Sequence, residues 1–118
     1  MSKKIFIIYG HHNTKQSFNA SIRDTFIEEA KSYGHEIDLI NLHDEKHIPF
    51  YDGTQISEQI LDYRKRLEQS DVMFMISPCY NLRASAILEN FLDICLAPKW
   101  FFSFKKVVGN WGYPVAGA

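Results

Sequence analysis

Two stretches of this 118-residue chain are apolar at consecutive positions, and they limit the possible folds more than any other feature. Residues Ile5–Tyr9 and Val72–Ile76 contain β-branched, aromatic and other large apolar side chains without a polar interruption. Such runs are typical of strands buried on both faces, as in parallel sheets that helices cover on each side. Neither run approaches the roughly 20 residues of a membrane-spanning helix.

Helix and strand patterns alternate along the rest of the sequence. Ser17 is the predicted N-cap of a helix that runs to about Tyr33, where Gly34 suits a left-handed C-terminal position. A half-polar strand over 36–42 follows, and then a helix over about 56–67 that Thr54 would cap. The buried strand over 71–77 and a helix over 84–97 come next. The apolar stripe of the first helix consists of Phe18, Ile22, Phe26, Ile27, Ala30 and Tyr33. We expect Phe18, Ile22 and Phe26 to lie in the core.

This β-α-β-α-β-α order predicts an α/β fold with an open parallel sheet and helices on both faces. The two most apolar strands are expected to be neighbours at the centre, with the strand over 36–42 outside the first. That arrangement gives the local order 2-1-3 of flavodoxin-like sheets. We expect residues 1–118 to form a single domain.

Charge and cysteine content exclude several classes of protein. The 13 Lys and Arg residues against 14 Asp and Glu give a net charge of −1, without the basic excess of a nucleic-acid-binding domain. The only dense basic run, residues 64–66, is followed by Glu68 and indicates a solvated helix face. Cys79 and Cys95 lack the CxxC spacing of a zinc ribbon or a redox pair. Because neither a secretory signal nor a membrane span is recognisable, we expect a cytoplasmic protein.

Two loops are the expected ligand site, because open α/β sheets bind ligands beyond the carboxyl ends of the strands, where the strand order reverses. Residues 10–19 offer small and hydrogen-bonding side chains before a helix N-terminus, which favours a phosphate, although such a loop is often only a cap. Residues 77–84 offer the aromatic Tyr80 and backbone amides for a flat ring. A phosphate on one loop and a ring on the other describe a flavin.

Other ligand motifs are missing. The sequence contains neither G-x-G-x-x-G nor G-x-x-x-x-G-K-[ST], so no Rossmann fingerprint or P-loop is predicted. His43 and His47 are four residues apart but do not form H-E-x-x-H, and they lie near Pro49 in a predicted loop. No metal site is therefore predicted.

The two loops resemble those of the flavodoxin-like NAD(P)H:quinone oxidoreductases. Tyr9–His11 followed by Ser17–Asn19 is similar to the family's Y-A-H and S-F-N segment. The stretch Ser77–Asp93 is similar to its P-L-W-W-F-G-M-P-A-x-L-K-x-W-x-D-R-V segment, and Pro98–Phe104 is similar to P-G-F-A-F. The resemblance is collinear and extends over essentially the whole chain.

If the resemblance holds, it implies FAD or FMN as cofactor, NAD(P)H as hydride donor, a quinone as acceptor, and a homodimer with the active site at the subunit interface. His11 would meet the flavin phosphates, next to Ser17, Phe18 and Asn19. The ring would contact Pro78, Cys79, Tyr80, Asn81 and Leu82. Phe102 and Phe104 would help to wall the acceptor pocket. No catalytic residue is assigned.

Differences from the family pattern leave an alternative open. Asn81 and Arg83 stand where an aromatic residue and a glycine are usual, and Ser85 replaces a proline. Family members continue for two more strand-helix units, so we expect this chain to end before a fourth strand and to leave the edge of Val72–Ile76 uncovered. The alternative function is a catalytically silent flavodoxin-like module that binds or regulates a partner.

Overall fold

A four-stranded parallel sheet forms the centre of the computed structural model, which describes residues 2–12, 15–53, 57–96 and 107–111. Its strand order is β2-β1-β3-β4, with neighbouring strands parallel throughout. The strands are β1 (Lys4–Tyr9), β2 (Glu36–Asn41), β3 (Val72–Ile76) and β4 (Val107–Trp111). The predicted local order 2-1-3 is confirmed, with the two most apolar strands side by side in the interior of the sheet.

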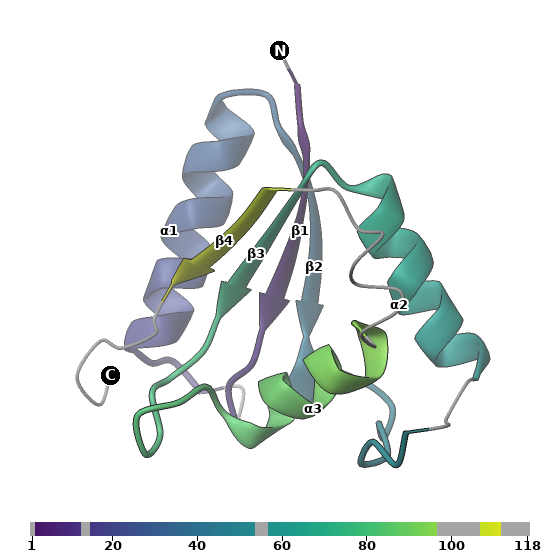
Figure 1. Cartoon of the computed structure of the whole chain (residues 1–118). Helices are drawn as coiled ribbons and strands as arrows, with labels where there is room; N and C mark the ends of the chain where they lie inside the picture. Colours follow the sequence, from purple (N-terminus) through teal and green to yellow (C-terminus); the bar gives the residue numbers. More distant parts are fainter. Residues whose placement is uncertain (1, 13–14, 54–56, 97–106, 112–118) are drawn as a thin grey trace.

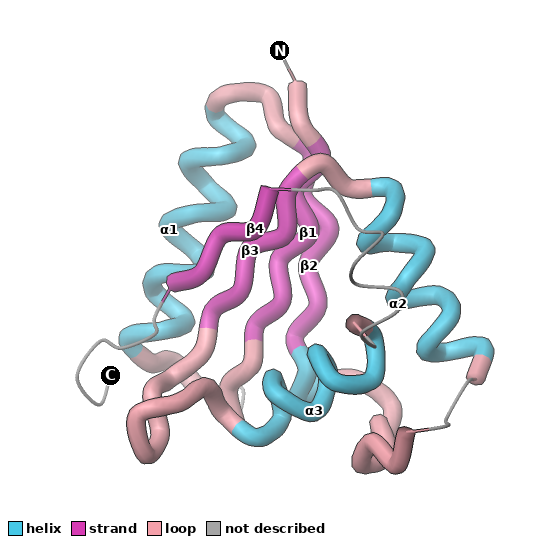
Figure 2. The backbone as a smooth tube through the Cα atoms, in the orientation of Figure 1, coloured by secondary structure: helices cyan, strands magenta, loops and turns pink. Residues whose placement is uncertain are grey.

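Helices cover both faces of this sheet (Figures 1 and 2). Helix α1 (Phe18–Ser32) lies on one face, and α2 (Glu58–Gln69) and α3 (Ala86–Cys95) lie on the other. Alternate side chains of β1 point to opposite faces: Ile7 packs in the cluster under α1, while Phe6 packs in the cluster under α2 and α3. Both are fully buried, so β1 is buried on both faces as predicted. Within the described ranges, no helix is long and apolar enough to cross a membrane.

A serine caps the N-terminus of each α-helix. The hydroxyl oxygens of Ser17, Ser57 and Ser85 accept a backbone N–H three residues further on, at 3.1, 3.3 and 3.4 Å. The predicted cap at Ser17 is confirmed, and Gly34 takes the expected left-handed conformation with φ +82°. Ser57 caps α2 in place of Thr54, which lies outside the described residues.

A fourth strand corrects the expected end of the sheet. The backbone of β4 pairs with β3 in parallel, from Val72 opposite Val107 to Ile76 opposite Trp111. The edge of β3 that we expected to be uncovered is therefore occupied. The sequence signal for β4 is weak because the segment is short and contains Gly109 and Asn110, residue types that are rare in strands.

The expectation that Phe18 lies in the core is wrong. Phe18 is 57% exposed and Tyr33 is 72% exposed, whereas Ala30 is buried against the sheet. Ile22, Phe26 and Ile27 are half-buried in the same cluster. The two exposed rings lie at the helix termini, beyond the residues that pack on the strands. Phe18 consequently stands in solvent beside the expected ligand site.

The expectation of a solvated basic run on α2 holds for Lys65, which is exposed, but not for Arg66, which is half-buried. The Arg66 guanidinium donates from Nη2 to Asp38 Oδ1 at 2.6 Å and from Nε to Oδ2 at 3.0 Å. It also lies 5.5 Å from the centre of the Phe6 ring. This two-pronged ion pair ties α2 to the edge strand β2 and raises the pKa of Arg66 through the hydrogen bonds to Asp38.

Candidate functional site

The two predicted loops meet at the carboxyl ends of β1 and β3, which are adjacent in the sheet (Figure 1). The Gly10 N–H donates to the Ile76 carbonyl at 2.8 Å, continuing the pairing beyond the strand ends. Ser85 then joins the loops, because its hydroxyl donates to the Gly10 carbonyl at 2.6 Å. Its own N–H donates to Ser77 Oγ at 2.9 Å. The expected site at the reversal of strand order is thus a tightly bonded junction.

Gly10 is required by the closeness of this junction. A Cβ atom at Gly10 would lie 2.7 Å from Leu88 Cβ and 3.2 Å from Ser85 Oγ, so any side chain there would collide with the start of α3. From the sequence, Ser85 was noted only as a replacement of the family's proline. Its roles as the N-cap of α3 and as the hydrogen-bonded link between the two loops were not predicted. The signal available in the sequence was a serine just before a helical apolar pattern.

In the first loop, the predicted residues His11, Ser17, Phe18 and Asn19 lie at or near the N-terminus of α1. The ring of His11 is buried and stacks between those of Tyr9 and His12, with centroids 5.8 and 4.3 Å away. The Tyr9 hydroxyl lies 3.2 Å from the Ser17 hydroxyl. The N-terminus of α1 is thereby held against the end of β1.

Asn19 is the most unusual residue of this loop. Its side chain is only 1% exposed, and neither Oδ1 nor Nδ2 has a hydrogen-bond partner within the described residues. An unsatisfied buried amide costs roughly 1–3 kcal/mol. The Ala20 N–H is taken by the Ser17 cap, but the first N–H groups of a helix, here those of Phe18 and Asn19, have no partner within the helix, so the start of α1 offers donors for an anion. The residues present here fit the phosphate end of a nucleotide.

The second loop forms a tight turn. Tyr80 and Arg83 exchange backbone hydrogen bonds of 2.9 and 3.1 Å, so their N–H groups are already used. Asn81 and Leu82 occupy the two central positions with φ +52° and +63°, in the left-handed region that costs a side-chain-bearing residue about 1–2 kcal/mol. Leu82 is 92% exposed at the tip. The N–H groups of both central residues take part in no hydrogen bond in this segment.

The turn carries the remaining predicted ring contacts. Pro78 is buried at its base, and Cys79 is half-buried. The Tyr80 hydroxyl is hydrogen-bonded to Nδ1 of His12, which links the two loops through their side chains. Partial burial raises the pKa of Tyr80. Arg83 turns toward α3, where its Nη1 lies 3.0 Å from Glu89 Oε2.

Two of the predicted residues cannot be placed. Phe102 and Phe104 lie outside the described residues, so their place at an acceptor pocket stays a prediction. In the described ranges, no group of three or more His, Cys, Asp or Glu side chains is arranged to hold a metal ion.

A parallel sheet with this strand order, helices on both faces and a donor-rich helix start at the reversal point defines a doubly wound α/β protein. The sequence matches the family with the flavodoxin-like fold over residues 3–116, and the chain belongs to that family. A comparison with curated protein sequences finds no match.

Several solved structures share the fold. The NAD(P)H:quinone oxidoreductase from Methanothermobacter marburgensis is 18% identical, with a TM-score of 0.69 over 81% of this chain and 54% of that one. FerB from Paracoccus denitrificans, a flavoenzyme NAD(P)H:(acceptor) oxidoreductase, is 22% identical, with a TM-score of 0.71 over 92% of this chain and 59% of that one.

An FMN-dependent NADH-azoreductase from Bacillus anthracis, solved in complex with FMN, is 17% identical, with a TM-score of 0.60 over 82% of this chain and 57% of that one. The chain therefore spans little more than half the length of these relatives.

Proposed function

We propose that the protein is a flavin-dependent oxidoreductase that uses NAD(P)H as electron donor and a quinone-type acceptor. The observation that carries this proposal is the buried amide of Asn19, which lacks a partner in the described chain beside the N-terminus of α1. The names of the structural relatives support a flavin in general, since one of them was solved with FMN.

The phosphate end of FMN or FAD would lie at the start of α1. There the helix dipole and the first backbone N–H groups favour a negative charge. The Asn19 amide would donate to the phosphate and so gain the partner it lacks in the described chain. The buried His11 ring, held by its stack on Tyr9, would form the adjacent wall.

The ring end of the flavin would lie along the Tyr80–Arg83 turn. The left-handed conformations of Asn81 and Leu82 hold two N–H groups that make no hydrogen bond within the described residues, and backbone donors of this kind stabilise charge on a reduced flavin. Strained backbone that packing maintains is often found at functional sites. The bound flavin would supply the redox chemistry, accepting hydride from NAD(P)H and passing two electrons to the acceptor.

A catalytically silent module is the second candidate. The turn lacks an aromatic side chain at Asn81, and the chain spans only about half of the relatives' length. This candidate predicts the same fold with no hydride transfer.

Absorption spectroscopy distinguishes the two candidates. We expect the purified protein to retain a visible flavin band after incubation with FMN or FAD and dialysis, and we expect NAD(P)H to bleach that band under anaerobic conditions. Retention without bleaching favours the silent module. Failure to retain either flavin contradicts both the cofactor and the site and also favours the silent module. Asn19→Ala should weaken flavin binding about tenfold or more, whereas Gln69→Ala, which removes an exposed amide on α2, should not change it.

The homodimer and the cytoplasmic location stay predictions from the sequence. Sedimentation of the purified protein with and without FMN tests the first. A single monomeric species in both conditions would contradict it.

A further inference from the structure

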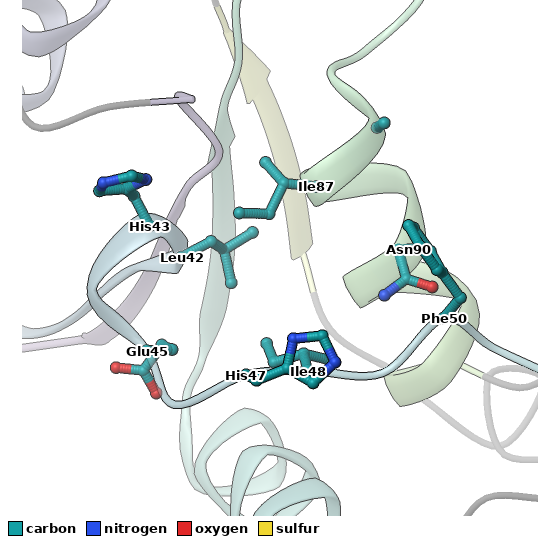
Figure 3. A pocket seen from close by; sticks show the side chains of 9 residues that line it. Leu42, His43, Glu45, His47, Ile48, Phe50, Ile87 and Asn90 are labelled. Carbon is teal, nitrogen blue, oxygen red and sulfur yellow. The ribbon is translucent and has the colours of Figure 1, made fainter.

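A cavity of about 380 Å³ lies apart from the two loops of the proposed flavin site (Figure 3). It is bounded by the chain that follows β2 and by the first two turns of α3. Leu42, Ile48 and Ile87 provide apolar walls, while His43, His47 and Phe50 stand around the opening. None of these residues belongs to the predicted flavin site. We propose that this cavity binds a small planar aromatic carboxylate.

The size and lining of the cavity are those of a small-molecule site. Ligand pockets usually have volumes of roughly 300–1,000 Å³ and are mainly apolar with a few polar groups. Here the side chains of Leu42 and Ile87 extend toward one another from opposite sides, and His47 lies next to Ile48 (Figure 3). One or two fused aromatic rings fit a space of this volume.

The walls are fixed before any ligand arrives. The Asn90 amide accepts the Tyr51 N–H at 2.9 Å and donates to the Pro49 carbonyl at 3.0 Å, which fastens the loop to α3. On the other side, the Gln59 amide donates to the Lys46 carbonyl at 2.9 Å and fastens the same loop to α2. The cavity is therefore preformed, and a ligand need not order the loop on binding.

The polar groups at the opening favour an anion. Glu45 also borders the cavity, but its carboxylate accepts the Tyr63 hydroxyl at 2.8 Å and is held toward α2. The imidazoles of His43 and His47 make no hydrogen bond or ion pair with other described residues. Imidazole N–H groups donate hydrogen bonds to carboxylates. A carboxylate at the opening would accept from one of these imidazoles.

The apolar part of the ligand is indicated by the rings at the opening. Phe50 is 81% exposed although its loop is fastened at both sides. A flat aromatic ring that enters between Phe50 and His47 would cover apolar surface on both and would extend to Ile87 below. Aromatic pairs prefer offset or edge-to-face contacts, which an open rim of two rings permits.

The test is an amide-resolved NMR titration of the full chain with two matched probes, 2-naphthoate and the uncharged 2-naphthalenemethanol. We expect the carboxylate to cause saturable chemical-shift changes in the amide signals of residues 42–50 and 86–90. We expect the alcohol to bind about tenfold more weakly. In a His43→Gln, His47→Gln double variant this difference between the two probes should disappear. Ile87→Trp should fill the cavity and abolish the shifts, while Leu61→Ala on the exposed face of α2 should leave them unchanged.

Three results would overturn the proposal: no saturable shift at about 1 mM probe, equal binding of acid and alcohol by the wild type, or shifts centred on the Tyr80–Arg83 turn. A fourth result would also refute the ligand: sedimentation shows a dimer, and the amides around the cavity resist hydrogen exchange and do not respond to the probe. The cavity would then be covered by a second copy of the chain. If Ile87→Trp does not fold, the histidine variants and the probe pair decide the question. Flavin retention is measured separately, so failure here leaves the flavin proposal untouched.

Discussion

Replacing Asn19 with alanine is expected to change the stability of the flavin-free protein and its affinity for flavin in opposite directions. The substitution removes a buried amide without a partner in the described chain, which relieves a cost of about 1–3 kcal/mol. Alanine is also the better helix former by about 0.5 kcal/mol. Against these gains stands a small cavity that costs about 1 kcal/mol.

The net result is a stabilisation of about 0.5–2.5 kcal/mol in the absence of flavin, or a rise in Tm of about 2–15 °C for a chain of this size. Flavin affinity should fall about ten- to a hundredfold, because a hydrogen bond to a charged group contributes about 1.5–3 kcal/mol. Urea denaturation of the flavin-free protein measures the first quantity, and fluorescence titration with FMN measures the second.

Asn90→Ala is the matched control for stability. This amide uses both of its ends, on the Tyr51 N–H and the Pro49 carbonyl, so its removal should destabilise the protein by about 1–2 kcal/mol. The reasoning about Asn19 is refuted if Asn19→Ala lowers the free energy of unfolding as Asn90→Ala does, because Asn19 would then have a structural partner.

Three further predictions concern the loops and the cysteines. Gly10→Ala should lower the free energy of unfolding by about 1–3 kcal/mol in urea denaturation, because its Cβ would lie 2.7 Å from Leu88 Cβ. Leu82→Gly should raise it by about 0.5–1 kcal/mol, because a residue 92% exposed at φ +63° loses strain and little packing. Iodoacetamide at pH 8 should label Cys79 but not Cys95 in mass spectra of the native protein, because burial raises the pKa of the Cys95 thiol to about 12 and keeps it in the unreactive protonated form below that pH.

The interior of the sheet was predictable because local chemistry determines it. The unbroken apolar runs of β1 and β3 identify strands buried on both faces, and Ser17 and Gly34 bound α1 through backbone rules that need no tertiary information. The order 2-1-3 then follows from the preferred handedness of the crossovers and from the burial of these two strands.

The elements that were missed depend on distant partners. The segment of β4 acquires its structure from pairing with β3 rather than from its own residue types, and Arg66 is withdrawn from solvent by Asp38 on another element. Phe18 continues a helical apolar stripe, yet the helix extends beyond the sheet and leaves its ring exposed. A periodic pattern cannot show where the packing partner ends.

The candidate site, too, has parts that could be predicted from the sequence and parts that could not. Topology placed the two loops together, and the structure brings His12 of one loop to Tyr80 of the other. The missing partners of Asn19 and the left-handed turn at Asn81 and Leu82 were not readable from the sequence, because burial and backbone angles at these positions result from the assembled fold.

The position of β1 has a consequence for how the chain reaches its native state. Among the described strands it comes first in the chain, yet its partner β2 follows only after the residues of α1, and its partner β3 only after those of α2. Its apolar side chains therefore stay exposed to solvent until the segments that cover them have been synthesised. Such long-range pairing slows folding and exposes aggregation-prone surface. We therefore expect the emerging chain to depend on chaperone protection until β3 has left the ribosome.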